Sequence, residues 1–301
     1  MNNFLWLIRR ELWEHKAIWI APAIVLGCIF LTMLAGRVHI SPFGVDGVMP
    51  AMTADQKTAI MTIILGAIPV LLVFCVMGII AFFYCIDALY ADRRDRSVLF
   101  WKSLPLSDAE TVMSKFAVAA VVIPLIALAA TLVTQLMLVG GESVKASFAG
   151  TSPAFEFDLK AILGAAFIAI FWCVTAMLWY APFVGYLMLA SAWAPRAPFL
   201  WAVLPPAGLW ILEAVVMRSE VVGDFISDRL LPLRPLMQYI THSLDAASAP
   251  DASKIDKFAS IDLNAAIVHF YRSPELWLGL VAAAALLAAA MWVRRYRDET
   301  A

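Results

Sequence analysis

The sequence has few charged residues and none of the common catalytic motifs. Only 15% of its 301 residues are charged, the net charge is −1, and 63% are hydrophobic. A near-neutral chain has no overall electrostatic attraction for nucleic acid. The G-x-x-x-x-G-K-[ST] phosphate loop, the H-E-x-x-H zinc pair and the G-x-S-x-G nucleophile elbow are all missing. This excludes ATP hydrolysis through such a loop, and we predict no catalytic residue, metal site or cofactor in this chain.

Cysteine and histidine are scarce as well. The four cysteines all lie within apolar runs, where small buried side chains are expected rather than a disulfide framework: Cys28, Cys75, Cys85 and Cys173. The four histidines lie far apart in the sequence, without the spacing of a zinc site.

Long uncharged runs dominate the rest of the chain. Residues 17–36, which end just before Arg37, carry no charge. The run is long enough to cross a bilayer core. Five further spans are predicted at 58–86, 116–141, 161–195, 198–217 and 276–293. The fold class we predict is therefore all-α: one polytopic membrane domain, residues 1–301, with six transmembrane helices.

The run 161–195 is too long for one straight span. Its 35 uncharged residues would form about 52 Å of helix, whereas the bilayer core is about 30 Å thick. Two spans here would place Arg294, Arg295 and Arg297 outside the cell, against the tendency of Lys and Arg to remain in the cytoplasm. We therefore predict a single span with a kink near Pro182, and both termini in the cytoplasm.

Two further segments flank or interrupt these spans. Residues 1–16 have apolar side chains at helical spacing, which predicts an interfacial helix along the membrane surface; the alternative is an extension of the first span into water. Trp6 and Trp13 favour the interface. Residues 218–274 form a predicted external segment that contains a flexible linker.

Segment 87–115 is the longest one predicted on the cytoplasmic side. It opens with alternating acidic and basic residues and continues with an aromatic patch. A short helix here must end near Leu104, because the residue before Pro105 is pushed out of the helical region. A new helix begins at Ser107, which forms a capping box with Glu110.

This segment, LYADRRDRSVLFWKSLP followed by SDAETVMSK, resembles the one between the second and third membrane helices of ABC-2-type permeases, the membrane subunits of ATP-driven transporters. The resemblance implies an inner-membrane permease subunit that exports an amphiphilic or peptide- or antibiotic-like substrate. It also implies a second permease subunit and separate ATPase subunits that bind ATP and Mg²⁺.

The resemblance further implies that a coupling helix within the segment contacts the ATPase. The implied contact residues are Arg93, Arg94, Asp95, Arg96, Leu99, Phe100, Trp101 and Lys102. The two aromatic residues have an alternative location in the lipid headgroup layer.

Asp87, Asp92 and Asp95 suggest an alternative function. Aspartate clusters at the cytoplasmic end of a helix hold Mg²⁺ in membrane prenyltransferases, but such sites need several carboxylates from more than one segment. Neighbouring arginines are able to neutralise this run, which favours an ion-paired surface over an enzyme.

Three residues within the spans are candidates for a translocation path: Glu213, Gln135 and Tyr180. An ionisable residue such as Glu213 inside a span indicates a functional site, unless it reaches the outer surface by snorkelling. Gln135 has the alternative role of a hydrogen bond between helices.

Overall fold

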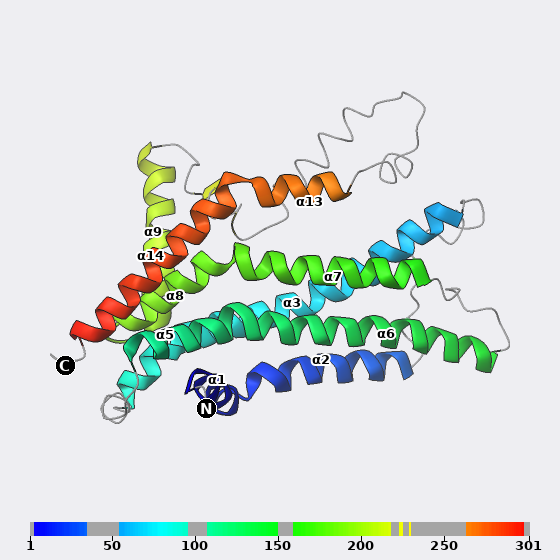
Figure 1. The fold of residues 1–301 in the computed structure, drawn as a ribbon, viewed down its shortest axis with the longest axis horizontal. Helices are drawn as coiled ribbons and strands as arrows, with labels where there is room; N and C mark the ends of the chain where they lie inside the picture. Colours follow the sequence, from blue (N-terminus) through cyan, green and yellow to red (C-terminus); the bar gives the residue numbers. More distant parts are fainter. Residues whose placement is uncertain are drawn as a thin grey trace.

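A computed structural model describes residues 3–34, 54–95, 107–149, 159–217, 223–224, 229 and 263–297. Every regular element within these residues is helical, which confirms the all-α fold class (Figure 1). The main helices, in chain order, are α1 (Asn3–Glu14), α2 (Ala17–Leu34), α3 (Ala54–Arg94), α5 (Asp108–Ala117), α6 (Ile123–Ala149), α7 (Leu159–Trp179), α8 (Ala181–Trp193), α9 (Pro198–Leu212), α13 (Leu263–Arg272) and α14 (Pro274–Arg297).

Several of these helices are long and apolar enough to cross a membrane. Within the described residues there are five such helices, or six if the bent pair α1–α2 counts as one span; α1 and α2 meet at 55°. Large apolar side chains remain exposed along them, as in Leu71, Leu136 and Leu278. Such a surface suits a solvent of lipid tails, and the protein is a multi-pass membrane protein.

The helix from Asp108 to Ala149 is continuous but not uniform. It begins with the predicted capping box, which is confirmed: the Ser107 hydroxyl accepts from the Glu110 N–H at 3.1 Å, and the Glu110 carboxylate accepts from the Ser107 N–H at 2.9 Å. Between α5 and α6 lies a π-helical turn, Val118–Val122. Pro124 follows this turn, and since proline cannot donate a backbone hydrogen bond, a wider turn before it avoids a break in the helix.

The long run around Pro182 is divided into two helices. α7 ends at Trp179, Tyr180 forms a bend, and Pro182 occupies the first turn of α8, where its missing N–H costs nothing. α8 then packs along α14. A Cβ atom on Gly185 would lie 3.2 Å from the Ala283 carbonyl oxygen, so the small residue permits this close approach.

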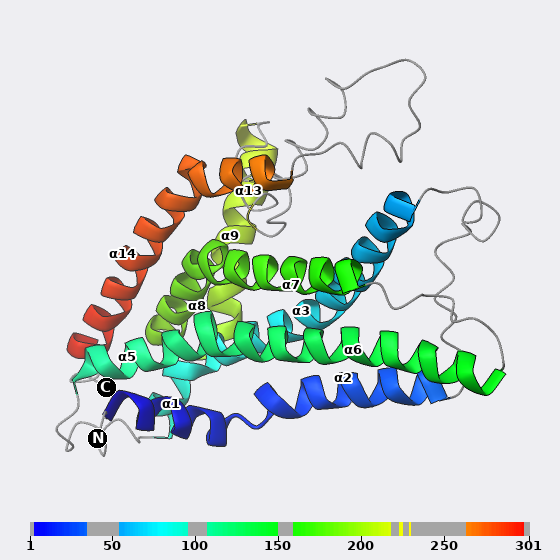
Figure 2. The ribbon, with the colours of Figure 1, turned by 45° about the vertical axis from the view of Figure 1, so that its right-hand side comes forward.

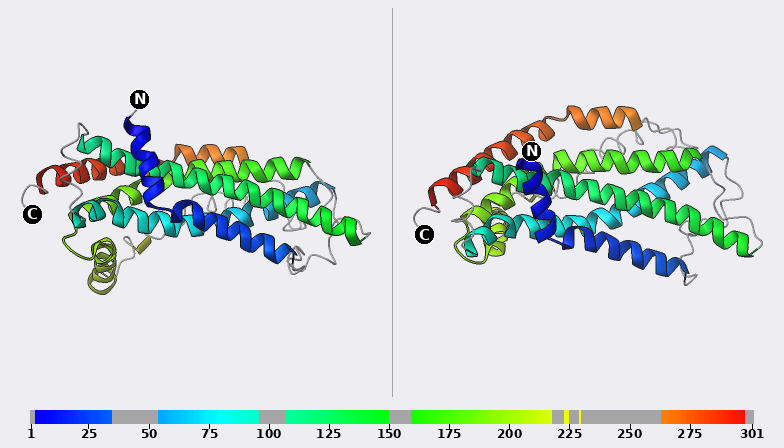
Figure 3. Two further views of the ribbon diagram at one scale, coloured as in Figure 1. Left: turned by 90° about the horizontal axis from the view of Figure 1, so that it is seen from below. Right: turned by 60° about the horizontal axis from the view of Figure 1, so that its bottom comes forward.

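α3 lies at the centre of the bundle and packs against α2, α6, α7 and α8. α9 also touches α3 and α8, but it stands away from the other helices, as the left view of Figure 3 shows. The same view shows α1 running across the bundle rather than along it.

Four helices meet at one end of the molecule, which we call the basal end. Here α3 and α14 finish, α5 begins and α1 crosses (Figure 2). Residues 96–106, which follow α3 and precede α5 in the sequence and which we call loop 96–106, lie outside the described residues.

Candidate functional site: a buried ionic network

The basal end holds charged side chains in the interior of the bundle. We call them the ionic network and define it by Glu11 of α1, Asp92 of α3, Asp108 and Lys115 of α5, and Arg294 of α14. Four of these five are buried, and Asp108 is partly exposed. The network thus joins four helices at the two ends of loop 96–106.

Glu11 and Lys115 form its inner part. Both are almost inaccessible to solvent, with 0% and 1% exposure, and Lys115 Nζ lies 3.0 Å from Glu11 Oε1. The Tyr84 hydroxyl donates to Glu11 Oε2 at 3.0 Å, and Arg10 Nη2 donates to Oε1 at 2.6 Å. Burial alone would raise the pKa of Glu11, but Lys115 and Arg10 outweigh it and hold the pKa below its ordinary value. Glu11 is therefore a buried carboxylate in its charged form.

Asp92 connects this pair to the C-terminal helix. Its Oδ1 lies 3.5 Å from Lys115 Nζ, and its Oδ2 accepts from Arg294 Nη1 at 2.9 Å. Arg294 Nε donates in turn to Asp108 Oδ1 at 3.2 Å. One guanidinium thus contacts the carboxylate that precedes loop 96–106 and the carboxylate that follows it.

Carboxylates and cations alternate in the network. Glu11, Asp92 and Asp108 contact Arg10, Lys115 and Arg294, and Arg10 also lies 3.4 Å from the half-exposed Glu14. Removal of one partner from a buried pair leaves an uncompensated charge and costs roughly 3–5 kcal/mol. We therefore expect the network to hold its four helices in one specific arrangement.

A second set of contacts fastens α3 to the end of α8. The Ser191 hydroxyl accepts from the Leu89 and Tyr90 N–H groups at 3.1 and 3.0 Å. Arg93 Nη2 donates to the Ser191 and Ala194 carbonyl oxygens at 2.5 and 3.0 Å, which supplies partners for carbonyls at the helix end. The last turns of α3 thus hold both α8 and the ionic network.

The predicted coupling residues are divided between described and undescribed parts of the chain. Arg94 and Asp95 are exposed and pair with each other at 3.0 Å, whereas Arg93 faces α8. The others lie outside the described residues: Arg96, Leu99, Phe100, Trp101 and Lys102.

Among the candidate path residues, the structure separates Gln135 from Tyr180. Gln135 is buried and its amide donates to the Ala165 carbonyl oxygen at 3.1 Å, so it joins α6 to α7. Tyr180 lies fifteen residues beyond Ala165, about 22 Å further along the helix direction. Glu213 is buried on the π-helical turn Glu213–Met217 that follows α9.

The three aspartates considered for Mg²⁺ binding do not turn toward one point. Asp87, which is partly exposed, and Asp95, which is exposed, both lie near Arg94, at 3.9 and 3.0 Å. Asp92 points instead to Lys115 and Arg294. With their oxygens engaged by cations from different helices, the three do not form the converging carboxylate set that a prenyltransferase requires.

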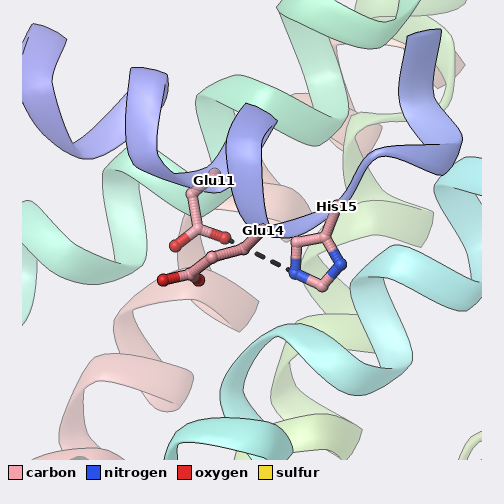
Figure 4. A group of neighbouring side chains, drawn as sticks. All are labelled: Glu11, Glu14 and His15. Atoms are coloured by element: carbon pink, nitrogen blue, oxygen red, sulfur yellow. Dashed lines mark ion pairs between the residues drawn. The ribbon is translucent and has the colours of Figure 1, made fainter.

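One group of side chains has the spacing of metal ligands. Glu11, Glu14 and His15 offer ligand atoms within 4.8 Å of one another, and His15 Nε2 lies 3.9 Å from Glu11 Oε2 (Figure 4). Both oxygens of Glu11 already accept from Arg10, Lys115 or Tyr84. A divalent ion would have to displace these partners, so the donor set does not favour one.

Comparison with known families identifies the central part of the chain. Residues 57–183 match the ABC-2 family transporter protein model. This match includes segment 87–115 and confirms its resemblance to ABC-2-type permeases, which are membrane components of transporters. Searches of curated proteins and of solved structures found no match to the chain.

The matched region of the permease contains only part of the ionic network. Asp92, Asp108 and Lys115 lie within residues 57–183, whereas Glu11 and Arg294 lie before and after them. The two terminal helices therefore supply charges that complete the network from outside the matched region.

Sequence reasoning missed Glu11, Lys115 and Arg294 as site residues. A signal for Glu11 was present, because it follows Leu7 by four residues and Ile8 by three, which places it on the buried face of α1. No sequence pattern indicated which charges pair with each other. Asp92 and Arg294, for example, are 202 residues apart.

Proposed function

We propose that this permease moves an amphiphilic or peptide- or antibiotic-like substrate out of the cell, driven by separate ATPase subunits that act on segment 87–115. The ATPase subunits bind ATP and Mg²⁺, and two permease subunits, identical or different, form the path. The protein lies in the inner membrane with the basal end and both termini in the cytoplasm. In support, α1 and the last turns of α14 meet at one end of the bundle.

One observation carries the proposal: segment 87–115 joins two of the longest helices of the matched region. α3 has 41 residues and leads into the segment, and the helix that begins at Asp108 leads away from it to Ala149. At about 1.5 Å per residue, each of them is longer than a bilayer core. A displacement of the segment therefore moves both helices along their whole length.

The exposed charges at the end of α3 suit an orienting role at the ATPase surface. Arg94 and Asp95 lie at the edge of loop 96–106 and are exposed, and such rim charges mainly tune the rate of association. Phe100 and Trp101 are the proposed anchors, because two adjacent large aromatic residues between charges are an apolar liability unless a partner or lipid covers them.

The test is to purify the permease with the ATPase encoded beside it and to measure their affinity in nanodiscs. Truncation of a buried aromatic anchor typically costs more than about 2 kcal/mol, so Trp101→Ala should weaken ATPase binding by about thirtyfold. Lys102→Ala should have a small, salt-sensitive effect. Trp292→Ala is the matched control, because Trp292 is an exposed tryptophan on α14. Unchanged affinity in a Phe100→Ala, Trp101→Ala double variant would refute this docking role.

A further inference from the structure

We propose that Arg294 is a positioning residue for loop 96–106 and that it makes α14 a third helix through which the loop acts on the bundle. This inference rests on the proposed function, which gives the loop its ATPase contact. It goes further because it gives α14, which lies outside the matched region, a part in transmitting movement of the loop. The proposed function assigned that part only to α3 and the α5–α6 helix.

The geometry begins with the two ends of the loop. Asp92 precedes residue 96 by four positions and Asp108 follows residue 106 by two, so both lie close to where the described helices stop. Arg294 reaches Asp92 through Nη1 at 2.9 Å and Asp108 through Nε at 3.2 Å. A single planar guanidinium therefore holds the two ends of the loop together.

The side-chain type matters for this contact. Arginine presents several N–H donors in a rigid fork, whereas lysine presents one compact charge on a flexible stem. A lysine at position 294 would keep the positive charge but would not hold two carboxylates in fixed directions. The bridge between Asp92 and Asp108 thus depends on arginine and not on charge alone.

Burial makes the bridge costly to break. Arg294 is 5% exposed, and removal of one partner from a buried pair leaves an uncompensated charge, whereas surface ion pairs are screened by water and salt and contribute little. Lys115 also contacts Asp92 and links it to Glu11, so α1 supports the same carboxylate. Fixing the ends of the loop lowers the entropy cost of presenting it to a partner.

The consequence is a mechanical connection to the far end of the molecule. α14 has 24 residues, about 36 Å of helix, and packs along α8 through the close contact at Gly185. At its other end α14 adjoins α13. When the ATPase displaces the loop, α3 and α5 move because the chain joins them to it. α14 moves with them because Arg294 connects it to Asp92 and Asp108.

The neighbouring arginine provides a matched control. Arg295 is exposed, and its guanidinium lies 5.7 Å from the ring centre of Tyr296 on the same helix. Arg294→Gln and Arg295→Gln therefore remove the same charge from adjacent positions, but only the first removes the bridge. Asp108→Asn removes one arm of the bridge at a partly exposed carboxylate and spares the buried pair with Asp92.

The experiment uses the full chain in nanodiscs, with a nitroxide spin label on Ser103→Cys and with the exposed Cys28 and Cys75 replaced by serine. We expect Arg294→Gln and Asp108→Asn to increase label mobility, and Arg294→Gln to weaken ATPase binding by about tenfold. That factor, about 1.4 kcal/mol, is less than the two charged hydrogen bonds of the bridge would supply, because the bridge affects the ATPase contact only indirectly. Arg294→Lys should give an intermediate result, and Arg295→Gln should match the wild type.

Two results would overturn the inference. The first is unchanged label mobility in both Arg294→Gln and Asp108→Asn. The second is an Arg294→Lys variant that equals the wild type in both measurements, because the charge alone would then suffice. The mobility measurement needs no ATPase, so failure of the wild-type permease to bind any ATPase would count against the proposed function and not against this bridge.

Discussion

Lys115 and Glu11 form an ion pair of 3.0 Å with both side chains almost completely removed from solvent. The pair joins the N-terminal helix to the helix that follows loop 96–106. It lies within the part of the bundle where Tyr84 and Arg10 also contact Glu11. α1 is thereby fixed to the bundle by charge at one face, while Trp6 and Trp13 remain exposed at another.

The first prediction concerns the strength of this pair. Lys115→Met should destabilise the folded permease by roughly 3–5 kcal/mol, because it leaves Glu11 with one cationic partner fewer in the interior. The added change Glu11→Gln should restore part of the loss, with a coupling energy of about 1 kcal/mol or more. The free energy of unfolding, measured in detergent for the single and double variants, gives both the loss of stability and the coupling energy. Lys16→Met is the control, because Lys16 is exposed; a loss as large as that of Lys115→Met would argue against a special role for the pair.

The second prediction is a pH dependence that originates in Glu11. The pKa of Glu11 in the folded protein lies below the ordinary 4.5, because Lys115 and Arg10 outweigh the opposing effect of burial. The unfolded chain therefore binds the proton more readily, and the stability from Glu11 is complete above about pH 4.5 and is lost as the pH falls through the lowered pKa.

A Glu11→Gln variant should show a shallower loss of stability over that acidic range. Glu14→Gln is the matched control, since Glu14 lies on the same helix with a half-exposed carboxylate. Thermal unfolding between pH 3 and pH 6 distinguishes the two, and identical slopes for the wild type and Glu11→Gln would contradict the assignment.

The third prediction tests the close contact between α8 and α14. Gly185→Val should destabilise the protein by roughly 1–3 kcal/mol, because even a Cβ atom would lie 3.2 Å from the Ala283 carbonyl oxygen and 3.3 Å from Leu286 Cβ. Gly208 of α9 is the control, because a Cβ atom there meets nothing within 4 Å. Gly208→Ala should be neutral or stabilising by up to about 1 kcal/mol, through helix propensity. Equal effects at the two positions would show that helix propensity and not packing dominates.

The fourth prediction concerns the orientation of the chain. Six spans with both termini in the cytoplasm place Asp251 outside and Thr300 inside. A membrane-impermeant thiol reagent should therefore label Asp251→Cys in intact cells and should label Thr300→Cys only after the cells are opened. Labelling of both from the same side would refute the topology.

The sequence alone was enough for features that depend on neighbouring residues. The uncharged runs predicted a polytopic all-α protein, and Ser107 with Glu110 predicted the start of α5. These features follow from local rules, because a bilayer excludes charge and unpaired backbone groups, and a helix start needs a partner for its free N–H groups. The resemblance in segment 87–115 likewise needed only contiguous residues.

Only the tertiary structure decided which charges meet. Arg294 lies 202 residues from Asp92 and 186 from Asp108, and the sequence shows each of them simply as a charge beside an apolar run. Their pairing depends on the packing of α14 against α8 and α5, and on the crossing of α1 over the basal end. A local pattern fixes which side of a helix a charge occupies. Helix packing decides which other charge it reaches, because that depends on the angle and position of helices that are distant in the chain.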